Sequence, residues 1–251
     1  MMHTNDQQMF YGDNGIGIVL IHGVTSGCAQ VVPLGKMLND YGYSVHCVNI
    51  AGHGTYPQEL LRTSWEDAIE KASYDYDLMK ENYEKVYIGG LSMGGCLSLA
   101  LASGRDDIDG VISMSAPLWL MPECFIIAPY PEDQIWLYRP LAGKTGTARR
   151  YHIHYEEIAT KVFREIKGLM NYLNEPGVLE KISCPVFVAQ ALDDDVADPK
   201  SAGEIMKRIS SENKQLYLTE KAGHLMPMNE GRFDFMKQLV PWLDSMDGIL
   251  S

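Results

Sequence analysis

The chain has 251 residues, with 21 lysines and arginines against 33 aspartates and glutamates, so its formal net charge is -12. This length suits one α/β domain with a modest insertion as well as two small domains, and one domain is the simpler interpretation. Because the negative charge repels phosphate backbones and anionic lipid surfaces, we expect no nucleic-acid partner and no stable membrane anchor.

Cysteine usage and the first residues bear on the compartment. The five cysteines are scattered at 28, 47, 96, 124 and 184 with no C-x-x-C pair, which favours neither a disulfide framework nor a zinc site. They are expected to be reduced, mostly buried thiols. The opening segment lacks the basic and apolar regions of a secretory signal, and no apolar run approaches a membrane span. We therefore expect a cytoplasmic protein.

Short β-branched segments alternate with helical patterns along most of the chain. A short helix within 30–42 is expected to end near Gly42, and a longer one begins at Ser64, with Asp67 in a capping-box position. Buried strands that alternate with helices predict an α/β fold with a mostly parallel sheet covered on both faces. The expected strands lie within 15–23, 43–50, 84–90, 109–116, 184–192 and 214–220.

The alternation stops between residues 118 and 182, where no clear strand pattern is found. We predict an α/β core of residues 1–117 and 183–251, with 118–182 inserted as a helical cap. Its aromatic first half offers Trp119, Phe125 and Trp136 as apolar surface for an acyl group. In its second half, residues 155–173 have the apolar spacing of an amphipathic helix, which serves either as extra packing or as a cap over a site.

A serine lies among glycines between an expected strand and an expected helix, in "GGLSMGG". Glycines 90, 94 and 95 permit a sharp turn that would present Ser92 as a nucleophile. An ordinary glycine-rich turn is the alternative, because this short pattern also arises by chance.

A serine nucleophile needs a base and an acid on later loops. His224 follows the last expected strand in a glycine-flanked loop and is the best placed of the seven histidines. Asp193, Asp194 and Asp195 follow the preceding strand; we choose Asp194, although the residues alone do not separate it from Asp193. The order Ser, Asp, His suits such a site. Structural or other non-catalytic roles are expected for the other histidines, which are His3, His22, His46, His53, His152 and His154.

An oxyanion also needs donors, and backbone N–H groups can supply them whatever the side chain. Met93 directly follows the nucleophile, and Val24 lies in the turn after the first long strand. We predict these two N–H groups as the oxyanion hole. The H-x-H pair in the insertion has no further ligand signature, so no metal site is predicted.

Five segments together resemble the α/β-hydrolase fold and, within it, the small bacterial carboxylesterase and monoacylglycerol lipase family: "VLIHGVTSG", "NIAGHGTYPQELLRTSWEDAIEKA", "YIGGLSMGGCLSLALA", "AQALDDDVADP" and "KAGHLMPMNEGR". The likeness runs from about Ile16 to Leu243. It implies Ser92 as nucleophile, Asp194 rather than Asp193 as acid and His224 as base, with the oxyanion donors at Val24 and Met93. Many relatives have an aromatic residue where Val24 stands, which implies a differently shaped pocket floor.

The resemblance implies a serine carboxylesterase that cleaves uncharged esters of short to medium acyl chains without a cofactor. Thioester, lactone or amide cleavage would use the same acyl-enzyme and stays an alternative. A non-catalytic small-molecule sensor, or an acidic scaffold that binds protein through exposed cap aromatics, is a further alternative. The expected partner is a small-molecule ester, and the chain is expected to be a monomer or a homodimer.

Overall fold

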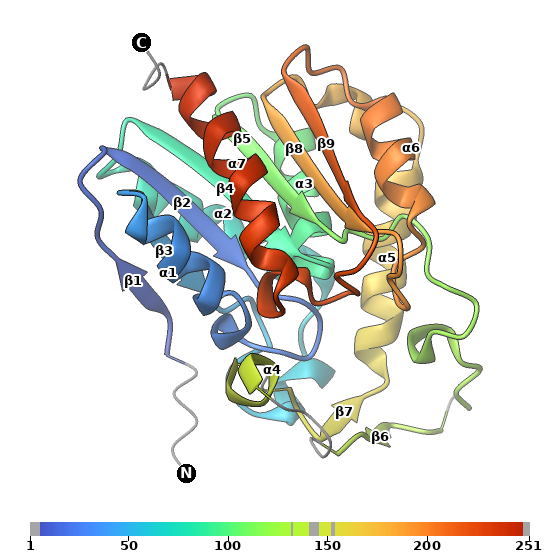
Figure 1. Cartoon of the computed structure of the whole chain (residues 1–251). Coiled ribbons are helices and arrows are strands. Elements are labelled where there is room, and N and C mark those ends of the chain that lie inside the picture. Colours follow the sequence, from blue (N-terminus) through green and yellow to red (C-terminus); the bar gives the residue numbers. More distant parts are fainter. Residues whose placement is uncertain (1–5, 132, 141–145, 152–153, 248–251) are drawn as a thin grey trace.

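The computed structural model describes residues 6–131, 133–140, 146–151 and 154–247 (Figure 1). Seven strands form the central sheet in the order β1-β3-β2-β4-β5-β8-β9, and only the β1–β3 pair is antiparallel. All six expected strands are confirmed, and β1 was not foreseen. The strands are β1 Gln8–Phe10, β2 Ile16–Ile21, β3 Ser44–Val48, β4 Lys85–Leu91, β5 Gly110–Met114, β8 Val186–Ala191 and β9 Lys214–Thr219.

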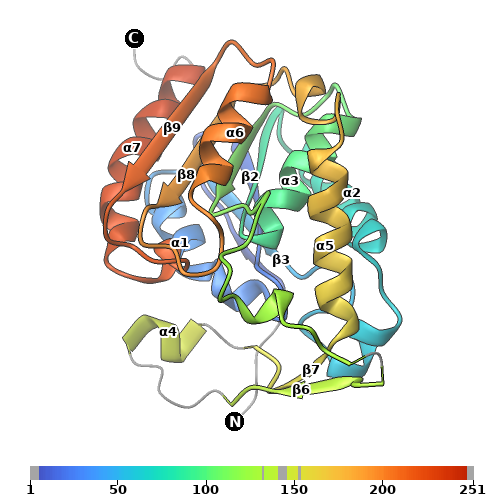
Figure 2. The same ribbon diagram turned by 90° about the vertical axis from the view of Figure 1, so that its right-hand side faces the viewer.

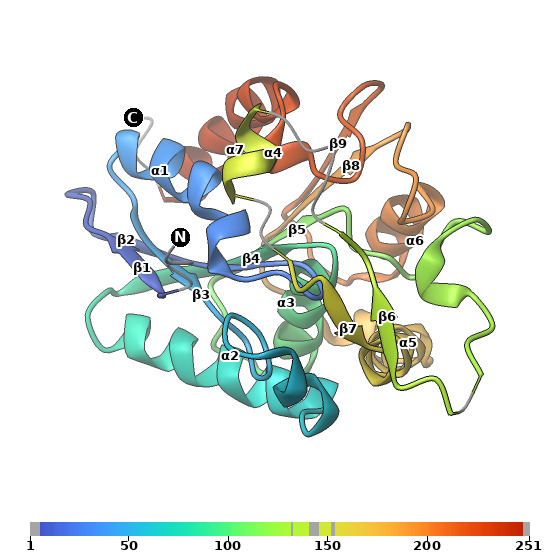
Figure 3. The same cartoon turned by 90° about the horizontal axis from the view of Figure 1, so that it is seen from below.

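Helices cover both faces of the sheet, so the predicted α/β class is confirmed. Seen from below, α1 Val32–Asp40 and α7 Gly231–Asp247 lie on one face, with α2 Trp65–Lys80 and α3 Met93–Gly104 on the other (Figure 3). Helix α6 Lys200–Arg208 packs beside β8 and β9, and α5 Lys161–Asn174 packs against α3. Single-turn 3-10 helices are η1 Cys28–Gln30, η2 Pro57–Leu61, η3 Phe125–Ile127, η4 Leu179–Lys181 and η5 Met226–Met228.

The pleat of each strand divides its side chains between two apolar clusters. In β2, Val19 and Ile21 belong to the cluster under α2 and α3, whereas Ile18 and Leu20 belong to the one under α1 and α7. All six residues of β2 are buried, as expected for a strand covered on both faces. This two-sided burial explains why β2 reads as a nearly continuous apolar run in the sequence.

The two helix ends expected from the sequence are confirmed. Ser64 and Asp67 form a reciprocal capping box at the start of α2, in which each side chain accepts from the other residue's backbone N–H. Helix α1 ends at Asp40, and Gly42 follows with a φ of 91°, a left-handed conformation that favours glycine.

The segment between β5 and β8 differs from expectation in two ways. It contains β6 Trp136–Tyr138 and β7 Glu157–Ala159, which pair with each other antiparallel, so the expectation of no strand there is wrong. The predicted helix over 155–173 is shortened, because Ile158 and Ala159 belong to β7 and α5 begins at Lys161. Three-residue strands are too short to show a periodicity. This ribbon and α4 Gly146–Tyr151 lie beyond the carboxyl ends of the parallel strands (Figure 2).

The cysteines agree with the expectation of mostly buried thiols. None of the five cysteines, all of which the structure describes, forms a disulfide, and four of them are buried, with Cys184 half-buried. Across the described residues, no helix combines the length and the apolar character that crossing a membrane requires.

Candidate active site

Ser92 occupies a strained turn between β4 and α3. Its φ of 58° and ψ of -117° lie in a region that residues other than glycine rarely adopt. The Ser92 N–H donates to the Met114 carbonyl over 2.8 Å, which fixes the turn to the neighbouring strand β5. A serine held in such a conformation at the end of a strand fits the sharp turn expected from the sequence.

The glycines around Ser92 are required by close packing of the backbone. A Cβ at Gly94 would lie 2.3 Å from the Ile21 carbonyl oxygen, and one at Gly90 would lie 2.5 Å from the Gly94 carbonyl carbon. At Gly95 a Cβ would meet the Ala116 Cβ at 3.0 Å. The first turn of α3 therefore contacts both the preceding strand β4 and the end of β2. A residue larger than glycine at position 94 would not allow this close approach.

Asp194 holds the imidazole of His224. Both carboxylate oxygens lie 3.0 Å from His224 Nδ1. Because an ionised carboxylate only accepts hydrogen bonds, Nδ1 carries the proton, and Nε2 of the neutral ring is left as a base. The two side chains come from the loops after β8 and β9, as predicted for acid and base.

The surroundings of Asp194 favour its ionised form. Burial by itself raises the pKa of Asp194, but the His224 hydrogen bond and the backbone N–H groups of Val196 and Ala197, each at 2.9 Å, hold that pKa below its usual value. Gln190 Nε2 donates to the other carboxylate oxygen over 2.9 Å. The carboxylate is therefore both buried and fully hydrogen-bonded.

Asp193 holds the same loop by its backbone. Its Oδ1 accepts from the N–H groups of Ala222 at 3.0 Å and Gly223 at 2.8 Å, directly before His224. These two bonds lower the pKa of Asp193. The neighbouring aspartates thus have separate tasks in the structure, and Asp194 is the one that contacts the imidazole.

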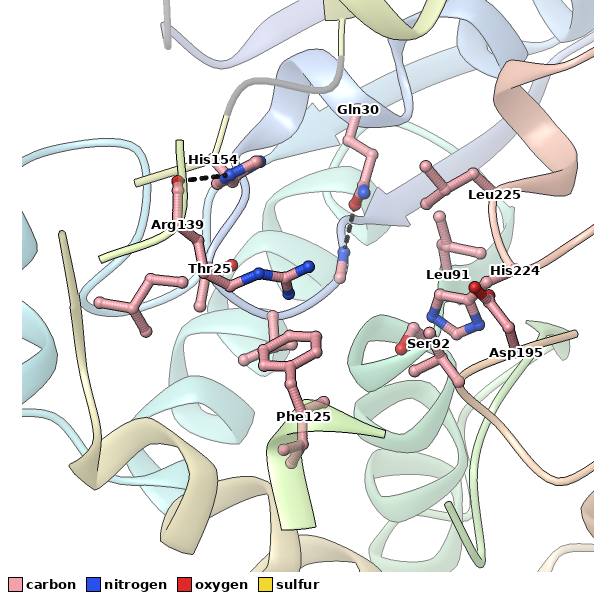
Figure 4. A pocket seen from close by; sticks show the side chains of 15 residues that line it. Thr25, Gln30, Leu91, Ser92, Phe125, Arg139, His154, Asp195, His224 and Leu225 are labelled. Carbon is pink, nitrogen blue, oxygen red and sulfur yellow. Dashed lines mark hydrogen bonds between the residues drawn. The ribbon is translucent and has the colours of Figure 1, made fainter. Parts of the chain in front are cut away.

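Of the two backbone positions expected for an oxyanion hole, Met93 follows Ser92 directly and Val24 lines the same cavity as Ser92. Met93 is the first residue of α3, where an N–H has no acceptor within the helix. Val24 belongs to the turn after β2, which is held by Gly23 N–H donating to Gln30 Oε1 over 2.6 Å (Figure 4). Gln30 is buried, and its role could not be read from the sequence because it lies seven residues along the chain from Gly23.

A cavity of about 260 Å³ opens beside Ser92. His224 and Asp195 lie at the Ser92 side, and Phe125, Thr25 and Arg139 lie across from them (Figure 4). Most of the wall is apolar, contributed by Val24, Leu91, Phe125, Ile126, Ile158, Val196 and Leu225. The volume lies below the roughly 300–1,000 Å³ typical of pockets for drug-sized ligands, which favours small substrates.

The three aromatic side chains expected in this wall are distributed differently. Phe125 lines the cavity, whereas Trp119 and Trp136 are not among its lining residues. Trp119 is 43% exposed and lies next to the bridge between Leu120 and Ala197, beside the start of α6. Trp136 is half-buried in β6 and pairs with Ala159. The prediction that Trp119 and Trp136 line the pocket is therefore corrected, because β6 and the segment beside α6 place them outside its lining.

Of the remaining histidines that the structure describes, one lines the cavity and three lie in or beside the sheet. His22 and His53 are buried with ring centroids 5.2 Å apart, and His46 is part of β3. His154 lines the cavity, while His3 and His152 lie outside the described residues. In the described parts of the chain, no group of three or more histidine, cysteine or acidic side chains could hold a metal ion.

Residues 15–155, more than half of the chain, match the model of the family described as serine aminopeptidase, S33. The chain belongs to this family. This S33 family member is also 28% identical over 92% of its length to a carboxylesterase of Bacillus subtilis (strain 168), which it covers to 93%. It is 26% identical over 88% of its length to a thermostable monoacylglycerol lipase of Bacillus sp. (strain H-257), which it covers to 87%.

Solved structures share the fold of this S33 family member. One, from work on the metagenome-derived lipolytic enzymes LipS and LipT, superposes with a TM-score of 0.84 at 20% identity, over 97% of this chain and 99% of that one. A soluble variant of monoglyceride lipase from Saccharomyces cerevisiae gives a TM-score of 0.78 at 19% identity, over 96% and 91%. At these identities the likeness shows the fold, which is that of the α/β hydrolases.

Proposed function

We propose that this S33 family member is a serine carboxylesterase that hydrolyses carboxylic esters of short to medium acyl chains through an acyl-enzyme. The observation that carries the proposal is the Asp194–His224 pair, 3.0 Å apart, beside a serine on a strained turn that opens into a small apolar cavity. The names of the two Bacillus relatives, carboxylesterase and monoacylglycerol lipase, support ester hydrolysis.

The first half of the reaction forms the acyl-enzyme. Ser92 Oγ attacks the ester carbonyl carbon while His224 Nε2 takes its proton, and Asp194 stabilises the imidazolium that results. The backbone N–H groups of Val24 and Met93 donate to the oxyanion. When the tetrahedral intermediate collapses, the proton passes from His224 to the departing alcohol.

The second half releases the acid. Water attacks the acyl carbon and gives its proton to His224, a second tetrahedral intermediate forms, and Ser92 leaves with the proton returned to its oxygen. Every proton passes through the one imidazole, so no metal or organic cofactor is required by the chemistry.

The compartment and the partners belong to the same proposal. A cytoplasmic enzyme is supported by five cysteines that form no disulfide in the described residues, which suits a reducing compartment. The net charge of -12 supports a small-molecule ester as partner, with neither nucleic acid nor a stable membrane anchor. A monomer or homodimer is proposed.

The test is the rate of hydrolysis of nitrophenyl esters from acetate to long acyl chains, for the unaltered chain and Ser92→Ala. We expect kcat to be highest for a short or medium chain and to fall roughly 10⁴- to 10⁶-fold in the variant. Ser103→Ala is the matched control, because Ser103 lies at the far end of the helix that follows Ser92, where its hydroxyl donates to the Ala100 carbonyl and lies 3.3 Å from the Tyr172 hydroxyl. More than a tenth of the activity remaining in Ser92→Ala would exclude Ser92 as the nucleophile.

A further inference from the structure

One charged side chain in the cavity has no part in the mechanism above. Arg139 follows β6 and lines the cavity across from Ser92, with its guanidinium directed toward the interior (Figure 4). Apart from Asp195 at the Ser92 side, the other lining side chains in the described residues carry no fixed charge. A guanidinium beside an apolar wall is energetically unfavourable, because desolvating a charge without a partner costs free energy. A functional explanation for the position of Arg139 is therefore sought in its contacts.

The guanidinium is held by an aromatic ring rather than by a carboxylate. Its central carbon lies 3.6 Å from the centroid of the Phe125 ring, a distance at which the charge sits directly over the ring face. Among the residues that the structure describes, no aspartate or glutamate lies within ion-pair distance of Arg139. Phe125 therefore fixes the position of the guanidinium without neutralising its charge.

The backbone at position 139 is also fixed. Its N–H donates to the Glu156 carbonyl over 2.7 Å, and its own carbonyl lies 3.3 Å from His154 Nε2. These contacts join the two strands of the cap ribbon beside the cavity. Both ends of the Arg139 side chain are therefore held in place, the backbone end by these contacts and the guanidinium by the Phe125 ring.

Stacking leaves a particular set of donors available. When the guanidinium lies over a ring, its face is covered, but its N–H groups point outward in the plane and can bind a planar carboxylate with two parallel hydrogen bonds. The carboxylate of Asp195, at the Ser92 side, repels an anion there, so a charged substrate would place its anion away from the reacting carbonyl.

We infer that Arg139, stacked on Phe125, is a subsite for a carboxylate on the substrate, so that esters carrying a second, free carboxylate are preferred over neutral esters of equal length. The inference rests on the proposed esterase activity and deepens it. The charge-neutral esters expected from the sequence enter the same cavity without using this subsite. Hydrolysis consumes one water and releases one proton in either case. An ester with the free carboxylate in its acyl part yields a dicarboxylate and an alcohol, and one with the free carboxylate in its alcohol part yields a monocarboxylate and a hydroxycarboxylate.

The experiment compares substrates that differ in one group. Monomethyl adipate carries the carboxylate in the acyl part, O-hexanoylglycolate carries it in the alcohol part, and methyl hexanoate is the neutral reference. The ratio of kcat/KM for each anionic ester to that for methyl hexanoate is measured by acid release. We expect Arg139→Gln to lower one of these ratios by roughly tenfold to a hundredfold, and the ratio that falls tells which part of the substrate carries the anion.

Arg62→Gln is the matched control, since it removes the same charge from a side chain that is 77% exposed and does not line the cavity. It should leave both ratios unchanged within about twofold. Arg139→Lys should give an intermediate ratio, because it keeps the charge and loses the planar edge. The inference is overturned if neither ratio falls in Arg139→Gln, or if Arg62→Gln lowers them equally.

A second readout separates failure of the subsite from failure of the proposed function. Adipate binding is measured by calorimetry on Ser92→Ala and on Ser92→Ala combined with Arg139→Gln. Binding that is lost in the double variant supports the subsite even if no ester is turned over. Absence of adipate binding to Ser92→Ala overturns the subsite, while hydrolysis of methyl hexanoate by the unaltered chain would leave the esterase proposal standing.

Discussion

Asp193 and Asp194 are neighbours in the chain, yet one carboxylate binds the backbone before His224 and the other binds its ring. Asp193 Oδ1 accepts from Ala222 and Gly223, whereas Asp194 accepts from His224 Nδ1. The loop after β8 therefore binds the loop after β9 through two side chains, those of Asp193 and Asp194. Because the two carboxylates bind different groups, substitutions of Asp194 and of Asp193 should change the kinetics differently.

Replacing Asp194 should remove most of the turnover. In Asp194→Asn the side-chain amide can donate to Nδ1, which favours the wrong tautomer and leaves Nε2 protonated, so kcat is expected to fall about 10⁴-fold. Steady-state kinetics on the best nitrophenyl ester measure this loss. A loss smaller than tenfold would show that Asp194 does not orient the base.

Replacing Asp193 should have a smaller effect, because Asp193 acts on His224 only by positioning its loop. Asp193→Ala removes both acceptors, and we expect kcat to fall roughly tenfold to a hundredfold with little change in KM. Asp193→Asn keeps an acceptor oxygen and should restore most of the rate. Equal rates for the two variants, or a rise in KM alone, would contradict the positioning role.

Gly94 and Gly104 are a matched pair in helix α3. Alanine at 94 would press its Cβ against the Ile21 carbonyl, so Gly94→Ala is expected to lower the free energy of unfolding by about 1–3 kcal/mol and to slow turnover. Alanine at 104 meets nothing within 4 Å and should stabilise the helix by up to about 1 kcal/mol. Urea unfolding of both variants checks the prediction, and equal midpoints would refute it.

The buried pair of His22 and His53 should make stability depend on pH. Burial lowers the pKa of His22 to about 3, with the charge of His53 adding to the effect, and burial lowers the pKa of His53 to about 4. Both rings are neutral in the folded state, whereas in the unfolded chain they take up protons as pH falls below about 6.5. Their contribution to stability is complete above that value and is lost as pH falls toward 4.

For each histidine the slope of the unfolding free energy reaches about 1.4 kcal/mol per pH unit in this range. His53→Gln keeps a donor for the Ala51 carbonyl, which His53 Nδ1 contacts at 2.9 Å, and removes the titration. Urea unfolding between pH of about 5 and 6 should therefore show a shallower slope in this variant. An unchanged slope would mean that His53 is not neutral in the folded protein.

The sequence was sufficient for those parts of the fold that depend on long buried elements. Strand β2 is buried along its whole length, and α2 begins with a capping box, so both leave a local signal. Strands β6 and β7 have three residues each and are stabilised by one another, which no local pattern records. The start of α5 differs from the prediction for the same reason, since Ile158 and Ala159 suit a helix and a strand equally well.

The site was predictable wherever a residue type is tied to a backbone feature. Ser92 stands among glycines that the turn requires, and His224 follows a strand end. The cavity wall was not predictable, because Trp119 and Phe125 come from one apolar stretch and only the path of the chain between β5 and β6 decides which of them lines the cavity. Arg139 carried no signal at all, since a lone arginine after "WLY" is usually a solvated one.

The contact between Gly94 and the end of β2 unites the serine turn with the turn that carries Val24. A Cβ at position 94 would also meet the His22 carbonyl oxygen at 2.7 Å, so these two segments leave no room to slide past one another. Ser92 and the proposed oxyanion donors therefore lie on one rigid unit, whereas His224 and Asp194 lie on two loops that are joined by side-chain hydrogen bonds. If heating loosened these two loops, ester hydrolysis would be lost even though Ser92 and the proposed oxyanion donors kept their arrangement.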